Sequence, residues 1–150
     1  MRAAAEALMS RPAPDPCPCG RRDRRGAVLA YGGCCGRYLD DFAHTPAPDA
    51  ETLMRSRYTA FVCERADYLM ATWHPTHRPE RLDFEPGVKW LGLEVRAHVL
   101  TDDDHAEVDF VARQRGRSGA ATRLAERSRF VREQGEGGLL RWYYLDGVMR

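Results

Sequence analysis

The sequence predicts an α+β protein in which helices pack on a curved antiparallel sheet, with a small zinc knuckle in front. Three observations carry this prediction. Two tight pairs of cysteines lie near the start of the chain, two helical patterns follow them, and from Val88 onward the apolar residues alternate as in strands. Because the helices precede the strands rather than alternate with them, the order favours α+β over a parallel α/β sheet.

Size and charge exclude several classes of protein. At 150 residues the chain can hold one domain of about 100 residues and a small module. No apolar run approaches the roughly 18 residues of a membrane span, and residues 1–16 lack the apolar core of a secretory signal. A net charge of +1 gives no general attraction to polyanions. We therefore expect a cytoplasmic protein without a membrane segment, and a flexible N-terminus over residues 1–16.

The candidate metal ligands are Cys17, Cys19, Cys34 and Cys35, which form two pairs on either side of residues 20–33. Each pair can present two sulfurs to one ion, and four thiolates around a tetrahedral zinc ion form a common structural site. Disulfides within a pair would be strained, and the alternative of disulfides between pairs needs an oxidising compartment. The sequence predicts one structural Zn²⁺, since four thiolates leave no position for water or substrate.

The loop between the cysteine pairs is basic. Arg21, Arg22, Arg24 and Arg25 lie within it and could face an acidic partner or RNA phosphates. The alternative is a solvated loop, because short basic runs are common on protein surfaces. The fifth cysteine, Cys63, stands apart on a helical segment, and we expect it to be a small buried hydrophobic residue rather than a ligand.

Two helices are predicted after a short Pro-containing connector at residues 44–48. Asp49 is the expected N-cap, with Glu51 in the first turn of a helix of about 15 residues. A second helical segment runs from Ala66 to Trp73 and ends before Pro75. The apolar stripe of the first helix consists of Met54, Tyr58, Phe61 and Val62.

Four strands are predicted after the helices, joined by turns rich in aspartate or glycine. Short connections of this kind favour an antiparallel meander. The concave face of such a sheet would bury the apolar faces of both helices. The alternating segments are Leu91 to Val99, Ala106 to Ala112, Leu124 to Glu133 and Leu140 to Asp146.

No complete catalytic set is recognisable, and the candidates for acid–base chemistry are His74 and Glu126. A histidine with an unperturbed pKa near 6.5 can move protons at neutral pH. With His77 nearby, His74 could pair with Glu126 or Asp146 as a proton-transfer dyad. The alternative is that His74 caps the C-terminus of the second helix, where a cation is favoured.

Glu126 is expected to point into the core. Leu124 and Phe130 share its face of the strand, so Glu126 and Ser128 face inward with them. A buried carboxylate needs a partner, and three residues could supply it. They are Arg55, Arg57 and His74. The result could be the polar floor of a pocket, or an ion pair that fixes a helix on the sheet.

Seven segments of the chain carry a resemblance to a known family. They are Leu53 to Phe61, Thr72 to Pro75, Glu126 to Phe130, Trp142 to Gly147, Trp90 to Leu93, Cys34 to Tyr38 and Phe110 to Arg113. These segments closely resemble the YchJ family of uncharacterised bacterial proteins. The resemblance covers nearly the whole chain from Cys17 onward.

The resemblance implies two parts. Residues 17–44 resemble a SEC-C zinc motif, and Cys17, Cys19, Cys34 and Cys35 match its four ligand positions. The motif is named for the tail of the SecA translocation motor, where the knuckle binds protein partners. Residues 49–150 are similar to nuclear transport factor 2, a cone of helices on a strongly curved sheet that often encloses a cavity.

These observations lead to a docking hypothesis and two alternatives. We expect a non-enzymatic adaptor that binds a protein or ribonucleoprotein partner through its zinc knuckle, while the second domain supplies a scaffold, a pocket or a homodimer face. The first alternative is a small-molecule-binding protein or enzyme that uses the cone cavity, with Glu126 and His74 at its site. The second is RNA binding through the arginine loop.

Overall fold

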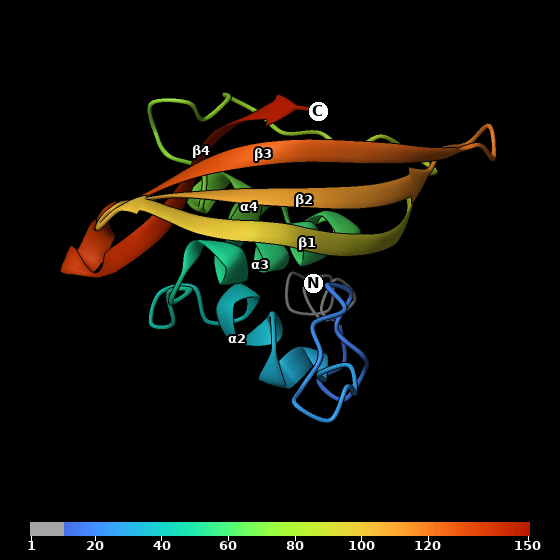
Figure 1. Ribbon diagram of the computed structural model, residues 1–150, viewed down its shortest axis with the longest axis horizontal. Coiled ribbons are helices and arrows are strands. Elements are labelled where there is room, and N and C mark those ends of the chain that lie inside the picture. The colour runs from blue at the N-terminus through green and yellow to red at the C-terminus, as the bar shows by residue number, and fades with distance from the viewer. Residues whose placement is uncertain (1–10) are drawn as a thin grey trace, which may run out of the picture.

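The computed structural model describes residues 11–150 and places helices on one face of a four-stranded sheet (Figure 1). None of the helices in this range is long and apolar enough to cross a membrane. The α+β order expected from the sequence is confirmed. The helical elements are η1 (Tyr31–Gly33), α2 (Gly36–Leu39), α3 (Ala50–Val62), α4 (Ala66–Ala71) and η2 (Glu136–Gly138), and the strands are β1 (Lys89–Asp102), β2 (His105–Arg115), β3 (Ala121–Gln134) and β4 (Leu140–Met149).

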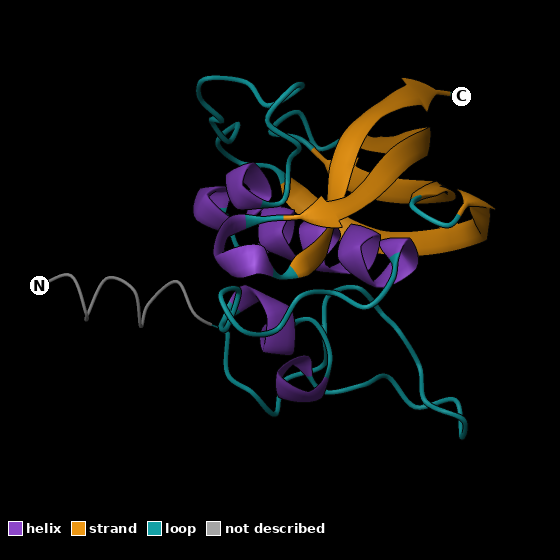
Figure 2. Ribbon diagram, turned by 90° about the vertical axis from the view of Figure 1, so that its left-hand side faces the viewer, coloured by secondary structure: helices purple, strands orange, loops and turns teal. Residues whose placement is uncertain are grey.

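The sheet is the predicted antiparallel meander in the order β1-β2-β3-β4, and it curves beside the helices (Figure 2). Three register shifts interrupt the pairing of β1 with β2, and a fourth interrupts that of β3 with β4. Such bulges bend a strand and change which face its side chains occupy. This explains why the predicted alternation in β1 fails at its ends, where Leu91 and Val99 are 40% and 55% exposed.

Helix α3 begins and ends through specific local contacts. The side chain of Asp49, the predicted N-cap, accepts a hydrogen bond of 2.7 Å from the Thr52 amide. At the other end Glu64 adopts a left-handed conformation with φ of 53°, and the Arg65 amide donates to the Ala60 carbonyl at 2.8 Å. The helix is therefore slightly shorter than the pattern predicted.

Helix α4 ends at Ala71 and not at Trp73, because the chain after it joins the sheet. The Tyr144 amide donates to the Thr72 carbonyl at 2.9 Å, and the His74 amide donates to the Tyr144 carbonyl at 2.8 Å. These bonds place Trp73 beside Tyr144 as a parallel bridge to β4. A contact with a distant strand thus overrides the local helical pattern.

The core is one continuous cluster that runs from the cysteines through α3 to the sheet. Cys17 and Cys35 belong to the same group of buried residues as Leu53 on α3 and Phe130 on β3. The knuckle is therefore packed on the helices rather than held apart by a linker.

The residues just before the knuckle are tied to it. The Tyr31 amide donates to the Asp15 carbonyl at 2.7 Å, and the Gly32 amide donates to the Ala13 carbonyl at 2.9 Å. Pro16 also forms a bridge with Ala30. A flexible N-terminus was expected over residues 1–16, and these backbone bonds connect the part from residue 13 on to the knuckle. Residues 1–10 lie outside the described part of the chain.

The packing of α3 on β1 buries Tyr58, and the stability of the protein at alkaline pH tests this burial. It is 3% exposed, and its ring meets that of Trp90 edge-on with centroids 5.6 Å apart. Burial raises the pKa of Tyr58 to about 12. The neutral Tyr58 side chain stabilises the folded state fully below about pH 10, the pKa of a tyrosine in the unfolded chain. This stabilisation is lost as the pH rises through 12.

We expect Tyr58→Phe to flatten the alkaline loss of stability. Urea unfolding in steps from pH 8 to 12 should show the wild type losing about 2–3 kcal/mol more than the variant. Burial also raises the pKa of Tyr68 and Tyr144, so the variant should still lose some stability at alkaline pH. Equal slopes for the two proteins would contradict this account of Tyr58.

Candidate metal centre

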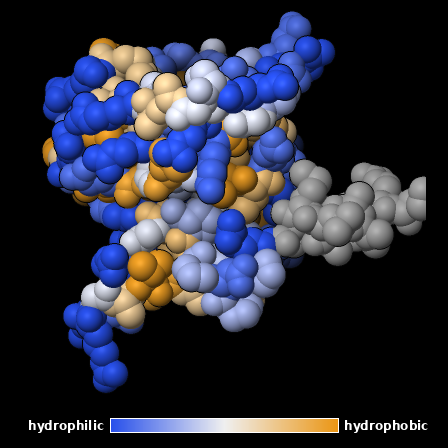
Figure 3. Space-filling model, turned by 90° about the vertical axis from the view of Figure 1, so that its right-hand side faces the viewer, coloured by the Kyte–Doolittle hydropathy of each residue, from blue (hydrophilic) through white to orange (hydrophobic). Residues whose placement is uncertain are grey.

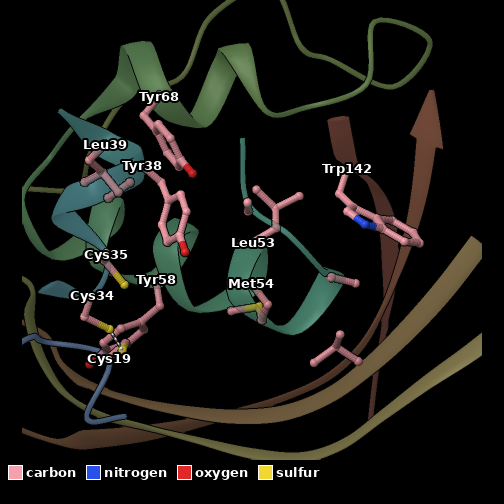
Figure 4. Packing of buried hydrophobic residues seen from close by; sticks show 14 of the residues in the cluster. Cys19, Cys34, Cys35, Tyr38, Leu39, Leu53, Met54, Tyr58, Tyr68 and Trp142 are labelled. Carbon is pink, nitrogen blue, oxygen red and sulfur yellow. Dashed lines mark hydrogen bonds between the residues drawn. The ribbon is translucent and has the colours of Figure 1, made fainter. Parts of the chain in front are cut away.

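The structure brings the four predicted cysteine ligands together. All four are buried, and their sulfur atoms lie within 4.8 Å of one another. The Sγ atoms of Cys19 and Cys34 are 3.6 Å apart (Figure 4). A tetrahedron of sulfurs at about 2.3 Å from a zinc ion has edges of about 3.8 Å. The cluster therefore has the donor atoms and the size of a four-thiolate metal site.

Two glycines shape the loops that carry these sulfurs. Gly20 follows the first pair with φ of +73°, and its amide donates to the Cys17 carbonyl at 3.1 Å. Gly36 follows the second pair, and a Cβ there would lie 2.7 Å from the Tyr31 carbonyl oxygen. The first glycine permits a tight turn, and the second permits the close packing of α2 on Tyr31.

The four sulfurs are electrostatically coupled. Hydrogen bonds from the other three thiols lower the pKa of Cys17, with the bond from Cys19 the largest cause. The hydrogen bond to Cys17 is the largest cause that raises the pKa of Cys34 and Cys35. Sulfurs this close cannot all carry negative charge by themselves, whereas a bound divalent cation favours the thiolate form of each.

Helix α3 supplies the outer contacts of the cluster. Thr59 Oγ1 lies 3.8 Å from Cys17 Sγ, and Arg55 Nη1 donates to the Cys19 carbonyl at 3.2 Å. Arg55 is held in turn by Glu51, to which its Nε donates at 2.8 Å. These contacts orient the ligand loop on the helix, as outer partners do at metal sites.

Cys63 takes no part in the cluster. It is the C-cap residue of α3 and is half-buried, whereas the sequence predicted a buried residue. The difference follows from the helix end, because a cap position lies at the rim of the core rather than within it.

The basic loop forms a hairpin, and its arginines divide into two groups. Arg21 turns inward and donates from Nη1 to Thr52 Oγ1 at 3.0 Å. Asp23 closes the tip, where its carboxylate accepts from the Arg25 amide at 2.8 Å. The hairpin projects below the helices in Figure 2 and forms the hydrophilic arm at the lower left of Figure 3. The exposed arginines are Arg22, Arg24 and Arg25.

The proposed dyad of His74 with Glu126 does not form. The Nε2 atom of His74 lies 2.7 Å from Glu133 Oε1, and its Nδ1 atom lies 2.7 Å from Thr76 Oγ1. His77 is the histidine beside Asp146, at 3.7 Å. His74 does not cap a helix either, because α4 ends at Ala71. The pairing was wrong because the sequence could not indicate which position along β3 His74 approaches: Glu133 lies on the same strand as Glu126, seven residues later.

Glu126 points inward as predicted and lies in a satisfied polar network. Its Oε1 accepts from Ser128 Oγ at 2.8 Å and from the Tyr144 hydroxyl at 3.0 Å. None of the three suggested partners forms an ion pair with it among the described residues, but the charge of Glu126 acts on Arg57, whose guanidinium lies 4.5 Å from the Tyr144 ring centroid. Between Leu53 and Trp142 the interior holds a cavity of about 10 Å³, room for about one water.

Arg141 and Tyr143, which were not singled out from the sequence, line both this small cavity and a neighbouring cleft of about 650 Å³. The available signal was an arginine within the apolar and aromatic run of β4. An arginine in such a run either lies at an exposed position or is buried with specific partners. Arg141 is only 5% exposed, which indicates the second case.

Comparison with known proteins places this fold and site in a family. Residues 49–147 match the family described as "YchJ, middle NTF2-like domain". A UPF0225 protein of Polaromonas sp. is 66% identical over 134 residues, which cover 89% of this chain and 93% of that protein. A UPF0225 protein of Bordetella parapertussis is 51% identical over 138 residues, which cover 91% of this chain and 95% of that protein.

Two solved structures resemble the whole arrangement. A SEC-C motif containing protein from Psychrobacter arcticus superposes with a TM-score of 0.76 at 30% identity, covering 92% of this chain and 84% of that one. Another from Rhodopseudomonas palustris gives 0.70 at 29% identity, covering 89% and 98%. With its four-cysteine cluster and NTF2-like domain, the chain belongs to the UPF0225 family of YchJ-like proteins.

Proposed function

We propose that this protein is a non-enzymatic adaptor whose four cysteines hold one Zn²⁺ and whose zinc knuckle docks on a protein or ribonucleoprotein partner. The observation that carries the proposal is the closed cluster of four buried sulfurs. A set of four thiolates leaves no coordination position for substrate, and such sites are structural. The cytoplasm suits this role, since reduced thiols persist there.

The exposed hairpin supports the docking part of the proposal. Arg24 and Arg25 are exposed, and neither forms an ion pair with an acid among the described residues. Arginines of this kind can form paired hydrogen bonds with carboxylates or phosphates of a partner. The zinc ion would hold the base of the hairpin rigid, so the arginines would meet the partner in a fixed arrangement.

Charge reversal at the hairpin tests this proposal. We expect the double variant Arg24→Glu and Arg25→Glu to lose at least about tenfold in affinity for a partner captured with the wild-type chain and then purified. The matched control is Arg113→Glu with Arg123→Glu, two exposed strand residues with the same charge change. Its binding should be unchanged.

Two further outcomes decide the nature of the docking. Loss of capture after nuclease treatment would identify the RNA of a ribonucleoprotein as the partner, and persistence would identify protein. Wild-type affinity in the hairpin variant would contradict the docking role of this surface. No observation favours the alternative of a site at His74 and Glu126, because the two side chains bind different partners.

A further inference from the structure

A cleft of about 650 Å³ opens where three segments of the chain meet. The segments are the connector after α2, the loop after α4 and the turn between β3 and β4. Neither the metal-ligand cysteines nor Glu126 line this cleft. Its volume lies within the range of about 300–1,000 Å³ that is typical of small-molecule sites. It is therefore a separate feature with the size of a binding site.

A buried guanidinium lines this cleft without a counter-charge. Arg141 is 5% exposed, and its Nη2 donates to the Ala43 carbonyl at 2.9 Å while its guanidinium lies 4.1 Å from the Phe42 ring centroid. Within residues 11–150, no carboxylate lies within ion-pair distance of it. A largely buried charge is costly unless an anion, protein acceptors or water satisfy its donors, and an anion compensates it best.

The unused donors of Arg141 remain open to solvent. Its Nε and Nη1 groups have no protein acceptor among the described residues, yet neither is among the polar atoms that are sealed from solvent without a partner. A guanidinium offers five N–H donors in a planar fork that matches carboxylate and phosphate oxygens. The free side of the fork is thus available to an oxyanion.

A second donor lies beside the first. Tyr143 is 9% exposed, and its hydroxyl has no protein partner among the residues described. Both side chains pack against Gly135, where a Cβ would collide with the Tyr143 hydroxyl and lie 3.3 Å from Arg141 Cδ. Gly135 has φ of −101°, so close approach rather than backbone conformation is what requires a glycine there.

The charges around the cleft favour a small ligand with one anionic group. Glu133 is engaged by His74 at 2.7 Å, and Arg78 at the rim uses Nε and Nη2 on the Trp73 carbonyl. Glu136 remains as an exposed carboxylate that would repel a highly charged polyanion. We propose that the cleft binds a small molecule through a carboxylate or phosphate group held by Arg141 and Tyr143.

Titration of the full chain with two simple anions tests the proposal. In ¹H–¹⁵N spectra, acetate or inorganic phosphate should move the Gly135 amide and the Arg141 Nε–H signal to saturation, while sodium chloride at equal ionic strength should not. Saturation by acetate alone would identify a carboxylate ligand, and saturation by phosphate alone a phosphoryl ligand. Either result supports the site.

Variants make the test specific. Tyr143→Phe should weaken binding about tenfold, because it removes one hydrogen bond to a charged group. Arg141→Lys should abolish saturation, since an ammonium lacks the planar fork. Arg123→Gln, at an exposed position on β3, should bind as the wild type does. The proposal fails if neither anion saturates, if the shifts are confined to residues 22–25, or if Tyr143→Phe binds with wild-type affinity. None of these outcomes depends on the docking function proposed for the hairpin.

Discussion

Removal of the zinc ion proposed for the cysteine cluster is expected to lower the melting temperature of the whole chain by at least about 10 °C, not only to loosen the knuckle. Structural zinc contributes on the order of 10–16 kcal/mol to small cysteine modules, comparable to the entire stability of a domain. Here the ligand loop is fixed to α3 through Arg55 and Thr59. Because the cysteines share one buried cluster with Leu53, loss of the ion should propagate into the helices and sheet.

Thermal unfolding followed by circular dichroism, with zinc measured by mass spectrometry under native conditions, checks this result. The wild type should contain one zinc ion per chain, and treatment with a chelator should remove it and shift the melting curve. Cys34→Ser should reproduce the shift without chelator. Cys63→Ser is the matched control, because Cys63 lies outside the cluster, and it should retain both zinc and stability.

Two results would contradict this account. A chain that contains no zinc but melts at the same temperature with and without chelator would show that the cluster is not a structural metal site. A melting transition of the knuckle alone, with the sheet unaffected, would show that the contacts through Arg55 do not couple the two parts.

The parts of this fold that local sequence determines were predicted well. Asp49 could be identified as an N-cap because a short polar side chain before an apolar stripe has one common use. The end of α4 could not be predicted in the same way, because Thr72 and His74 bond to Tyr144 on a strand about 70 residues later. The bulges of β1 could not be predicted, because a single register shift changes the alternation of apolar and polar residues too little to be recognised.

The same distinction separates the two candidate sites. The cysteine cluster was predicted because each pair of ligands is nearly contiguous and its spacing alone limits what it can bind. The cleft at Arg141 was missed because it is assembled from three distant segments, each of them unremarkable in sequence. For His74 the expected partner was Glu126, but the structure pairs it with Glu133, seven residues further along the same strand.

Arg57→Ala is expected to cost about 3–5 kcal/mol of stability at pH 7. Arg57 is 5% exposed, and its Nη1 donates to the Leu69 carbonyl at 2.8 Å and to Thr72 Oγ1 at 2.7 Å. Its guanidinium also lies over the rings of Trp73 and Tyr144, at 5.2 and 4.5 Å from their centroids. It thereby joins α3 to α4 and to β4.

Burial lowers the pKa of Arg57 to about 10, so the side chain is still charged at neutral pH. The nearby Glu126 favours this charged form. Truncation to alanine would leave a cavity and remove the positive charge that interacts electrostatically with Glu126, and both changes are unfavourable. Urea unfolding at pH 7 measures the loss. Arg123→Ala, an exposed arginine on β3, is the control and should change stability by less than about 0.5 kcal/mol.

A second substitution separates charge from packing at this position. If Glu126 and Arg57 stabilise each other, Glu126→Gln should cost less in an Arg57→Met background than in the wild type, because the carboxylate has then already lost its cation. Additive effects of the two changes would mean that Arg57 acts through its two hydrogen bonds and ring contacts alone. An Arg57→Ala variant within about 1 kcal/mol of the wild type would refute both accounts, because a buried arginine that links three elements cannot be removed without cost.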